Sequence, residues 1–516
     1  MMPAADLLAR WDPAGGLLEG RGQRAQNDSW IMVHEGRDLI ASGVCLQKRD
    51  RAMEQAQAKN RTRTGRALLL MISGVIVFAT TFPALGGEVK KEYPRLGGIQ
   101  IGTTPYNGYG DPAYRKAMAR LDLVLLGGSG KIMNDHDRAI KDLNPDILLA
   151  KYTNVTAVLD KENDYNTPLI RKLSSEQGPN NTNASDWWLR DFEGERVTGA
   201  TKGNVRTNIT EWVKPDSQGR RWPEFKAEHD YNQWFKDTVW DIWYSDVSNW
   251  RPKFQNRGFI GDFSGGKIED QAEVEAGWRR GHRSWWRAIR RLRPGIMIMA
   301  NHNWYLYQDK NNGVWDIKEY DKQVEGGLLE RIMGWDNSFE ANKGWHRLYD
   351  AYRWSDEYLR GTPVLFFNVI GKVDDYQFFR YAFATCLMGN GFFDYSPEKF
   401  HYGTVEWFDE FDRDGKDTTS WMGLPAAGSA WPDTAWQKGV YRRDFENAVV
   451  LVNPRGNGVK TVDVEEGLRR LSGRQDPAVN NGKVAGRIQL ADGDGIVLVR
   501  EDYLLRPDTP GIEVSK

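Results

Sequence analysis

Short apolar runs alternate with longer stretches of helical periodicity from Arg95 onward. This alternation is typical of consecutive β–α units, whose strands lie side by side in a parallel sheet. Several runs are continuously apolar, as expected of strands covered on both faces. The eight candidate strands are 96–102, 121–128, 146–154, 258–266, 296–303, 326–334, 362–371 and 391–397.

Helical patterns separate most of these runs. They cover 111–121, 135–145, 270–294, 345–361 and 376–391. Eight strands with intervening helices predict an α/β protein with a (β/α)8 TIM barrel, here over about 93–435. A doubly wound open sheet is the rival architecture, but no glycine-rich phosphate loop follows any candidate strand.

The connection between the third and fourth predicted strands, about 155–257, is unusually long. It contains a predicted hairpin with its turn at Glu193-Gly194. It also contains a tryptophan-rich segment, 231–250, which we expect to be the barrel helix before the fourth strand. Insertions after barrel strands lie above the active face, so this segment is a candidate wall of a substrate cleft.

The pattern changes after Pro397. Two strand pairs are expected, in 438–456 and in 486–502, with turns near 445–447 and 492–495. They predict a small antiparallel C-terminal β domain over about 437–505. Because this stretch contains no tryptophan, we interpret it as a structural cap rather than a carbohydrate-binding module.

The amino terminus has the pattern of a secretory signal. Basic residues at 61–66 precede an apolar run that ends in small residues, so 61–87 predicts a signal peptide cut after Gly86. An uncleaved anchor tethering the protein to a membrane is the alternative. Both a cleaved signal peptide and an uncleaved anchor predict a secreted, periplasmic or cell-envelope protein. Residues 1–60 are expected to be a disordered tail, or to result from a translation start that was assigned too far upstream.

Composition narrows the function. A net charge of −1 argues against a nucleic-acid partner. Of the two cysteines, Cys45 precedes the signal and Cys386 lies in an apolar run, so no internal disulfide is expected. Of the 22 tryptophans, 20 fall between Trp187 and Trp436. As a group they favour a carbohydrate substrate, because flat aromatic rings stack on the apolar faces of sugars.

Catalytic groups in such barrels come from the carboxyl ends of the strands. The fourth and sixth predicted strands carry Asp262 and Glu330 there, and the eighth carries Asp394. Cleavage of a glycosidic bond needs two carboxyl groups that flank it. The sequence therefore predicts Asp262 as nucleophile or base and Glu330 as acid/base. Asp394 could replace one of them or orient a sugar hydroxyl group.

Other polar and aromatic residues at or just beyond the strand ends are candidates for substrate binding. They are Tyr106, Lys151, Tyr152, Asn154, Asn301, His302, Trp304, Trp335, Asn368, Asp394 and Tyr395. The seven histidines show no metal-binding spacing, so neither a metal nor another cofactor is expected. Two alternatives stay open: a non-catalytic glycan-binding barrel, and a lyase or aldolase that forms a Schiff base at Lys151. The oligomeric state is not predicted.

Three segments resemble a known family. They are 93–127, 258–266 and 327–334, and they look like the hypothetical glycosyl hydrolase family 15, over about Tyr93 to Pro397. The resemblance implies a (β/α)8-barrel glycosidase that cleaves O-glycosidic bonds, and we expect its substrate to be an extracellular or envelope polysaccharide.

Acids on strands four and six are also similar to the placement in the α-galactosidase-like clan and the polygalactosaminidase-like barrels. That similarity implies an aspartate nucleophile on strand four and a proton donor on strand six. The large clan with glutamates on strands four and seven is a poor match, because the seventh predicted strand has no carboxylate.

Overall fold

The computed structural model describes most of residues 88–506. The described ranges omit 101–109, 128–132, 176–186, 200–202, 238, 253, 256–257, 260, 268–269, 303–319, 335, 337, 398–404 and 428–430. Within them, no helix is long and apolar enough to cross a membrane. The predicted signal or anchor segment, 61–87, lies outside the described residues.

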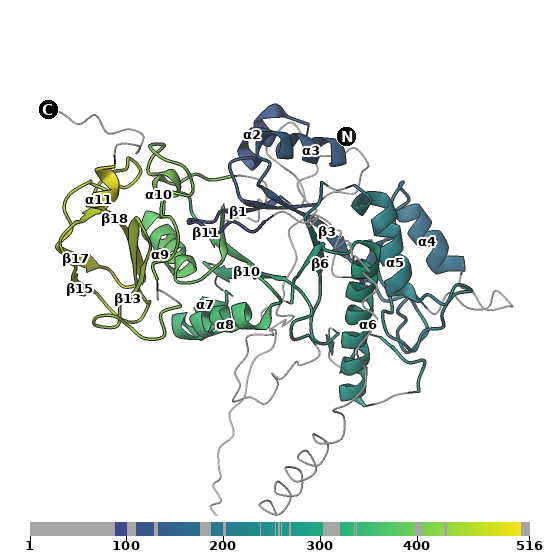
Figure 1. Cartoon of the computed structure of the whole chain (residues 1–516). Helices are drawn as coiled ribbons and strands as arrows, with labels where there is room; N and C mark the ends of the chain where they lie inside the picture. Colours follow the sequence, from purple (N-terminus) through teal and green to yellow (C-terminus); the bar gives the residue numbers. More distant parts are fainter. Residues whose placement is uncertain are drawn as a thin grey trace, which may run out of the picture. The chain divides into compact units, whose positions relative to one another are not determined.

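Eight parallel strands form a closed barrel (Figure 1). A parallel bridge between Leu96 and Phe393 joins the first strand to the last and closes the sheet. The predicted (β/α)8 fold is therefore confirmed. In sheet order the strands are β1 (Gly97–Gln100), β2 (Leu123–Leu126), β3 (Leu148–Asn154), β6 (Ile242–Asp246), β9 (Met297–Ala300), β10 (Gly326–Met333), β11 (Val364–Gly371) and β12 (Phe392–Pro397).

The barrel interior is a packed apolar layer. Since side chains alternate across a strand, each strand sends every second residue inward. One inward residue per strand, in sheet order, gives Ile99, Leu125, Ala150, Tyr244, Met299, Leu328, Phe366 and Phe392, all buried in one cluster. The outward side chains belong to a second cluster, between the strands and the helices.

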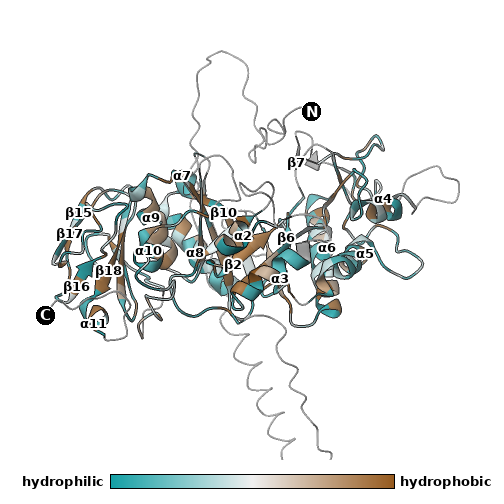
Figure 2. Cartoon of the chain, turned by 90° about the horizontal axis from the view of Figure 1, so that it is seen from above, coloured by the Kyte–Doolittle hydropathy of each residue, from teal (hydrophilic) through white to brown (hydrophobic). Residues whose placement is uncertain are grey.

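Helices form at five of the predicted positions: α2 (Pro112–Met118), α3 (Met133–Leu143), α6 (Gln271–Leu292), α8 (Trp345–Tyr358) and α9 (Tyr376–Leu387). Figure 2 colours their hydrophilic residues teal. The barrel connections also contain α5 (Trp222–Asp230), followed by a π-helical turn η2 (Tyr231–Phe235), and α7 (Phe339–Lys343). Helix α6 begins where the Asp270 side chain accepts a hydrogen bond from the Ala272 amide.

The fourth barrel strand is not the predicted one. It is β6, Ile242–Asp246, which pairs with β3 and β9. The prediction of a helix over 231–250 is therefore wrong beyond Phe235. In the predicted strand, 258–266, only Gly258–Phe259 form a strand (β8), which pairs with β7 (Phe254–Gln255) in a small hairpin.

The aromatic residues of β6 explain this error. Both faces of the strand are buried, with Trp243 outward and Tyr244 inward, so no polar alternation marks it. The third βα connection thus runs from Val155 to Asp241. It carries β4 (Ala157–Leu159), α4 (Asn166–Ser175) and β5 (Asn204–Arg206) in addition to α5.

The C-terminal region forms two small antiparallel sheets. One contains β13 (Tyr441–Asp444), β14 (Ala448–Asn453), β18 (Asp494–Arg500) and β16 (Leu468–Arg470), and the other contains β15 (Lys460–Asp463) and β17 (Arg487–Leu490). The hairpin in 438–456 is confirmed. The second expected pair is wrong, because β17 and β18 belong to different sheets. Two short helices, α10 (Asp409–Asp412) and α11 (Glu501–Leu504), flank this region.

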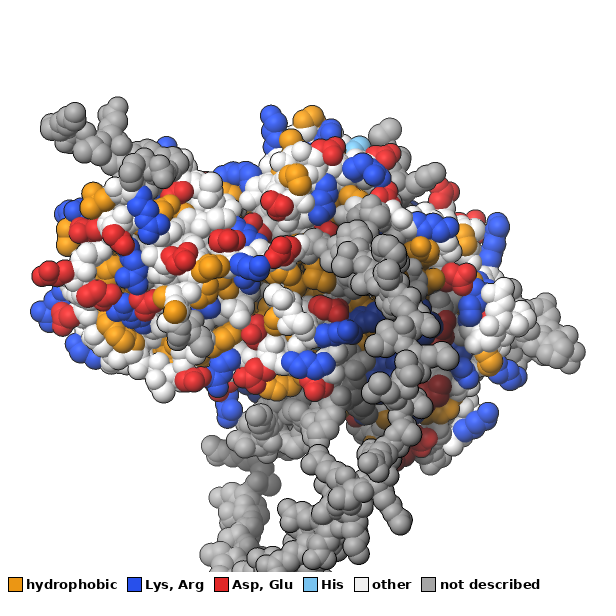
Figure 3. Space-filling view, in the orientation of Figure 1, with side chains coloured by type: hydrophobic (Ala, Val, Ile, Leu, Met, Phe, Trp, Pro, Cys, Tyr) orange, Lys and Arg blue, Asp and Glu red, His pale blue; other side chains and the backbone are white. Residues whose placement is uncertain are grey.

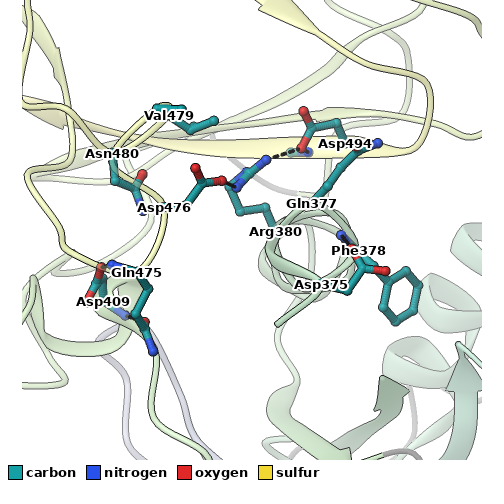
Figure 4. Close-up of polar contacts among 12 residues, drawn as sticks. Asp375, Gln377, Phe378, Arg380, Asp409, Gln475, Asp476, Val479, Asn480 and Asp494 are labelled. Atoms are coloured by element: carbon teal, nitrogen blue, oxygen red, sulfur yellow. Dashed lines mark hydrogen bonds and ion pairs between the residues drawn. The ribbon is translucent and has the colours of Figure 1, made fainter. Parts of the chain in front are cut away.

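Helix α9 joins these sheets to the barrel. Its residue Arg380 reaches Asp476 and Asp494 of the C-terminal region (Figure 4). The guanidinium is almost fully buried, and burial raises the pKa of Asp494. Charges of both signs are interspersed over the outer face in Figure 3, in keeping with the near-zero net charge.

Candidate active site

Polar side chains replace the apolar layer at the carboxyl ends of the strands. Each lies two residues beyond an inward apolar residue, so it shares the inward face of its strand. They are Tyr152 (β3), Asp246 (β6), Asn301 (just after β9), Glu330 (β10), Asn368 (β11) and Asp394 (β12). The barrel therefore brings together the carboxyl groups of three different strands at one mouth.

Two of these carboxylates share a hydrogen-bond donor. The side-chain amide nitrogen of Asn301 lies 3.1 Å from Oδ1 of Asp246 and 3.0 Å from Oε2 of Glu330. Both carboxylates are half-buried, and the Glu330 side chain is 17% exposed. A carboxylate in an otherwise apolar barrel is stable only when it has polar partners or faces solvent, and this pair has both.

Asp246 has two further donors. The Tyr152 hydroxyl donates to its Oδ2 atom at 2.6 Å, and the Tyr244 hydroxyl lies 3.4 Å from Oδ1. Burial raises the pKa of Asp246, the Tyr152 bond opposes that shift, and the charge of Glu330 adds to it. The two carboxyl groups therefore lie close enough for the charge of one to affect the other.

The backbone departs from regular strand geometry directly after both carboxylates. Val247 and Arg331, which directly follow Asp246 and Glu330, have positive φ angles of 52° and 51°. This conformation is uncommon for non-glycine residues and is a clear outlier for the β-branched valine. Such strain costs about 1–3 kcal/mol and clusters at functional sites. It fits a mouth built to hold the two carboxylates.

The remaining inward residues form a second polar group. The Asn368 amide and the Ser396 hydroxyl both donate to Oδ2 of Asp394, the latter at 3.2 Å. The Asn368 carbonyl oxygen accepts the Arg331 backbone amide at 2.8 Å. Burial raises the pKa of Asp394 to about 7, against the effect of its two donors. Asp394 is thus placed to offer either a donor or an acceptor to a ligand in the mouth.

Asp262 lies outside the barrel strands, in the loop between β8 and α6. Its backbone amide donates to the Arg190 carbonyl at 2.7 Å, and its carboxylate accepts the Ser264 amide at 3.0 Å. The expectation that Asp262 ends the fourth strand is wrong, because Asp246 occupies that place. The spacing Ile242, Tyr244, Asp246 on one face of a strand is the signal that could have located it.

Lys151 faces away from the barrel interior. It lies on β3 between the inward residues Ala150 and Tyr152, and its ammonium group sits over the rings of Trp234 and Trp240, at 4.7 and 5.3 Å. Burial lowers its pKa. The prediction that Lys151 binds substrate, and the Schiff-base alternative that depends on it, do not agree with this orientation.

Two other predicted site residues also point outward. The His302 ring packs among Trp286, Tyr320 and Tyr358, and its Nδ1 atom lies 3.0 Å from the Ser248 carbonyl. Tyr395 packs on aromatic residues of α9, and its hydroxyl donates to the Lys372 carbonyl at 2.9 Å. Both expectations are corrected for the same reason: strand alternation assigns these side chains to the helix-facing side.

The other predicted residues divide as follows. Asn154, at the end of β3, accepts the Thr156 amide at 2.8 Å and pairs in register with Asp246. Tyr106, Trp304 and Trp335 lie outside the described residues. Within the described ranges, no group of three potential metal ligands is found.

A cavity of about 440 Å³ lies elsewhere in the fold. Its lining includes Arg120, which precedes β2, so it is near the amino ends of the strands rather than the mouth that holds Asp246 and Glu330. Its side chains bind one another: Trp407 donates to Asp412 at 2.9 Å, and Arg474 donates to Asp414 at 2.7 Å. Because these groups are already paired, we assign the cavity no catalytic role.

No known protein-family profile matches the chain, and no curated protein sequence matches it. The resemblance to the hypothetical glycosyl hydrolase family 15 therefore stays a prediction.

Solved structures with related architecture include glycoside hydrolases. An Anoxybacillus α-amylase is 10% identical over 79% of this chain and 97% of its own, with a TM-score of 0.43. A GH27 β-L-arabinopyranosidase from Geobacillus stearothermophilus is 9% identical, covering 82% and 98%, with a TM-score of 0.44. The GH36 α-galactosidase AgaA from the same organism is 11% identical, covering 79% and 55%, with a TM-score of 0.42. Likeness of this degree carries no argument about activity.

Proposed function

We propose that this protein is a glycoside hydrolase whose catalytic pair is Asp246 and Glu330. The observation that carries the proposal is their shared hydrogen bond from Asn301 at the barrel mouth. Two adjacent carboxyl groups on the inward face of a barrel are what hydrolysis of a glycosidic bond requires. Asp246 replaces Asp262 in the pair that the sequence suggested, while Glu330 is retained.

We assign the nucleophile to Asp246 and the acid/base to Glu330. Three donors, from Tyr152, Tyr244 and Asn301, favour the ionised form of Asp246. Glu330, which shares the Asn301 donor, is left as the acid/base, because the reaction needs one carboxylate anion and one proton donor.

The reaction then has two displacements. The Asp246 carboxylate attacks the anomeric carbon while its bond to the leaving oxygen breaks and Glu330 protonates that oxygen. In the second step Glu330 takes a proton from water, the water oxygen bonds to the anomeric carbon, and the Asp246 ester breaks. Asp394 and Asn368, on the neighbouring strands, are positioned to bind sugar hydroxyl groups beside this pair.

The geometry favours retention of anomeric configuration. Because both bonds from Asn301 start at one nitrogen, the two carboxylate oxygens are no more than about 6 Å apart, which is below the ~6.5–9.5 Å that separates the carboxyl groups of inverting enzymes. This limit supports the two-step route over direct attack by water.

The proposed substrate is a polysaccharide outside the cell or in its envelope. Support comes from the basic and apolar pattern of residues 61–87, which is typical of an export signal or anchor. The long connection after β3 adds a wall beside the mouth. Membership of the hypothetical glycosyl hydrolase family 15 agrees with this proposal and rests on the sequence resemblance alone.

The test is to compare Asp246→Asn, Glu330→Gln and Asp262→Asn on a panel of bacterial exopolysaccharides and aryl glycosides, following reducing ends or released phenol. We expect the first two variants to lose at least about 10³-fold in kcat/KM on an accepted substrate, and the third to remain within a few fold. If Asp246→Asn and Glu330→Gln both hydrolyse the substrate at the rate of the wild type, the assignment is rejected. Binding without turnover in the wild type would instead favour a glycan-binding barrel.

A further inference from the structure

One aromatic side chain in the connection after β3 is exposed. Phe192 is 70% exposed, and it is the only aromatic residue among the exposed large hydrophobic side chains of the described ranges. A single exposed hydrophobic residue needs no explanation by itself. The place of Phe192 in the fold, on a hydrogen-bonded turn, is what makes it informative.

Phe192 stands at the tip of a braced hairpin. The Asp191 carboxylate accepts the backbone amides of Glu193 at 3.1 Å and of Glu195 at 2.8 Å. Gly194 supplies the positive φ of 90° that the turn needs, and Arg190 pairs with Arg196 below it. The backbone that carries Phe192 is therefore braced by hydrogen bonds on both sides, and its ring is presented to solvent.

The base of the hairpin is tied to the connection that leaves β3. Trp188 bridges to Thr207, and the Thr207 hydroxyl donates to the Val155 carbonyl at 2.7 Å. Val155 directly follows Asn154, the last residue of β3. This attachment fixes the hairpin at the carboxyl end of the barrel.

A second attachment joins the hairpin to the connection that leaves β6. The Asp262 amide donates to the Arg190 carbonyl at 2.7 Å, and the Asn208 amide donates to the Phe263 carbonyl at 2.9 Å. Both connections start beside the candidate site, at Asn154 and Asp246 respectively. The hairpin is thus part of a wall on the same face as the catalytic pair.

We propose that Phe192 is a platform on which a sugar unit remote from the scissile bond stacks. The apolar C–H face of a pyranose packs on an aromatic ring, while its rim hydroxyls stay in water or find polar partners. Phe192 lies on the connection after β3, outside the barrel strands that carry Asp246 and Glu330, so we assign it a sugar unit other than the one attacked. The substrate is therefore a chain of several sugars. This inference rests on the proposed function and adds to it a residue that binds the polysaccharide away from the reacting bond.

The test compares Phe192→Ala and Phe192→Trp with the wild type. The matched control is Leu505→Ala, which removes a side chain that is 80% exposed in the C-terminal region. Each protein is assayed on the accepted polysaccharide and on the accepted aryl glycoside. We expect Phe192→Ala to raise KM for the polymer about tenfold with kcat and the aryl glycoside unchanged, Phe192→Trp to stay near wild type, and Leu505→Ala to change nothing. An unchanged KM for the polymer in Phe192→Ala overturns the platform while the hydrolase assignment stands.

Binding measurements separate the platform from catalysis. In native gels containing each polysaccharide of the panel, the wild type should be retarded, and Phe192→Ala should run faster than the wild type. If the wild type hydrolyses nothing, the proposed function fails, yet retardation lost in Phe192→Ala still supports the platform. Equal retardation of the two proteins, or no retardation of the wild type by any polysaccharide, overturns it.

Discussion

Asp246 and Glu330 accept hydrogen bonds from one and the same nitrogen atom, at 3.1 and 3.0 Å. They come from strands four and six of the barrel, and the donor, Asn301, follows the strand between them. The three strands thereby bring two like charges together and supply the dipole that makes their proximity tolerable. The proposed chemistry depends on this arrangement.

Replacing Asn301 by leucine removes that dipole from both carboxylates. Loss of this donor to its charged form raises the pKa of Asp246, so fewer molecules have Asp246 ionised at a given pH. We expect kcat/KM to fall about 10²-fold and the acidic limb of its pH profile to move to higher pH. The measurement is the pH dependence of kcat/KM, and an acidic limb that stays in place would count against the role given to Asn301.

Tyr152→Phe tests the strongest bond to Asp246. The hydroxyl donates at 2.6 Å and lowers the pKa of Asp246, so its removal raises that pKa. The acidic limb of the kcat/KM profile should shift upward, with a loss of roughly tenfold near neutral pH. The unfolding temperature serves as the control, because a change in Tm without a change in the profile would make Tyr152 a purely structural residue.

The predictable and unpredictable parts of the fold differ for a physical reason. Strands such as β10 and β11 are long apolar runs bounded by turn residues, and their sequence alone locates Glu330 and Asn368. Strand β6 is short and aromatic on both faces, so its tryptophan-rich sequence resembles an amphipathic helix. Because of that single misplacement, the sequence predicted Asp262 as the nucleophile in place of Asp246, the residue proposed above.

The other errors arise because the sequence does not show which face of a strand a side chain occupies. Knowing that Lys151 and Tyr395 lie near strand ends does not say which face they occupy, because a shift of one residue moves a side chain to the opposite face. The register with a neighbouring strand settles the face: Tyr152 pairs with Tyr244, and Asn368 with Asp394. Those pairings become visible only once the barrel is closed.

Two buried histidines make the stability of the protein depend on pH. Burial lowers the pKa of His282 to about 3 and that of His302 to about 4, against about 6.5 when unfolded. The folded state favours their neutral forms, so the contribution of these histidines to stability is full above about pH 6.5 and declines as the pH falls toward 4. Buried Asp394, whose pKa is raised to about 7, changes the stability in the opposite direction over this range. The histidine contribution is therefore measured by comparing the wild type with a histidine variant, using urea unfolding at pH 7.5 and pH 5.0.

The variant His282→Leu isolates one contribution. Between pH 7.5 and pH 5.0, each histidine lowers the free energy of unfolding by about 2 kcal/mol. The variant should therefore lose about 2 kcal/mol less than the wild type on acidification. Identical losses in the two proteins would mean that His282 is not held neutral by the fold.

Arg380 couples the C-terminal sheets to the barrel (Figure 4). Arg380→Met leaves Asp476 and Asp494 without their buried partner, and breaking a buried ion pair from one side costs about 3–5 kcal/mol. We expect that loss in the free energy of unfolding by urea. Arg474→Met is the control, because its pair with Asp414 involves an exposed side chain and should matter little. Equal effects of the two substitutions would contradict the coupling.

Azide rescue tests the central claim most directly. In Asp246→Gly the nucleophile is gone and a small anion can occupy its place, so azide should restore turnover of the best aryl glycoside and give a glycosyl azide of inverted anomeric configuration. In Asp262→Gly turnover should proceed without azide. Rescue confined to Asp262→Gly, or no rescue of an inactive Asp246→Gly, would contradict the assignment of Asp246 as nucleophile.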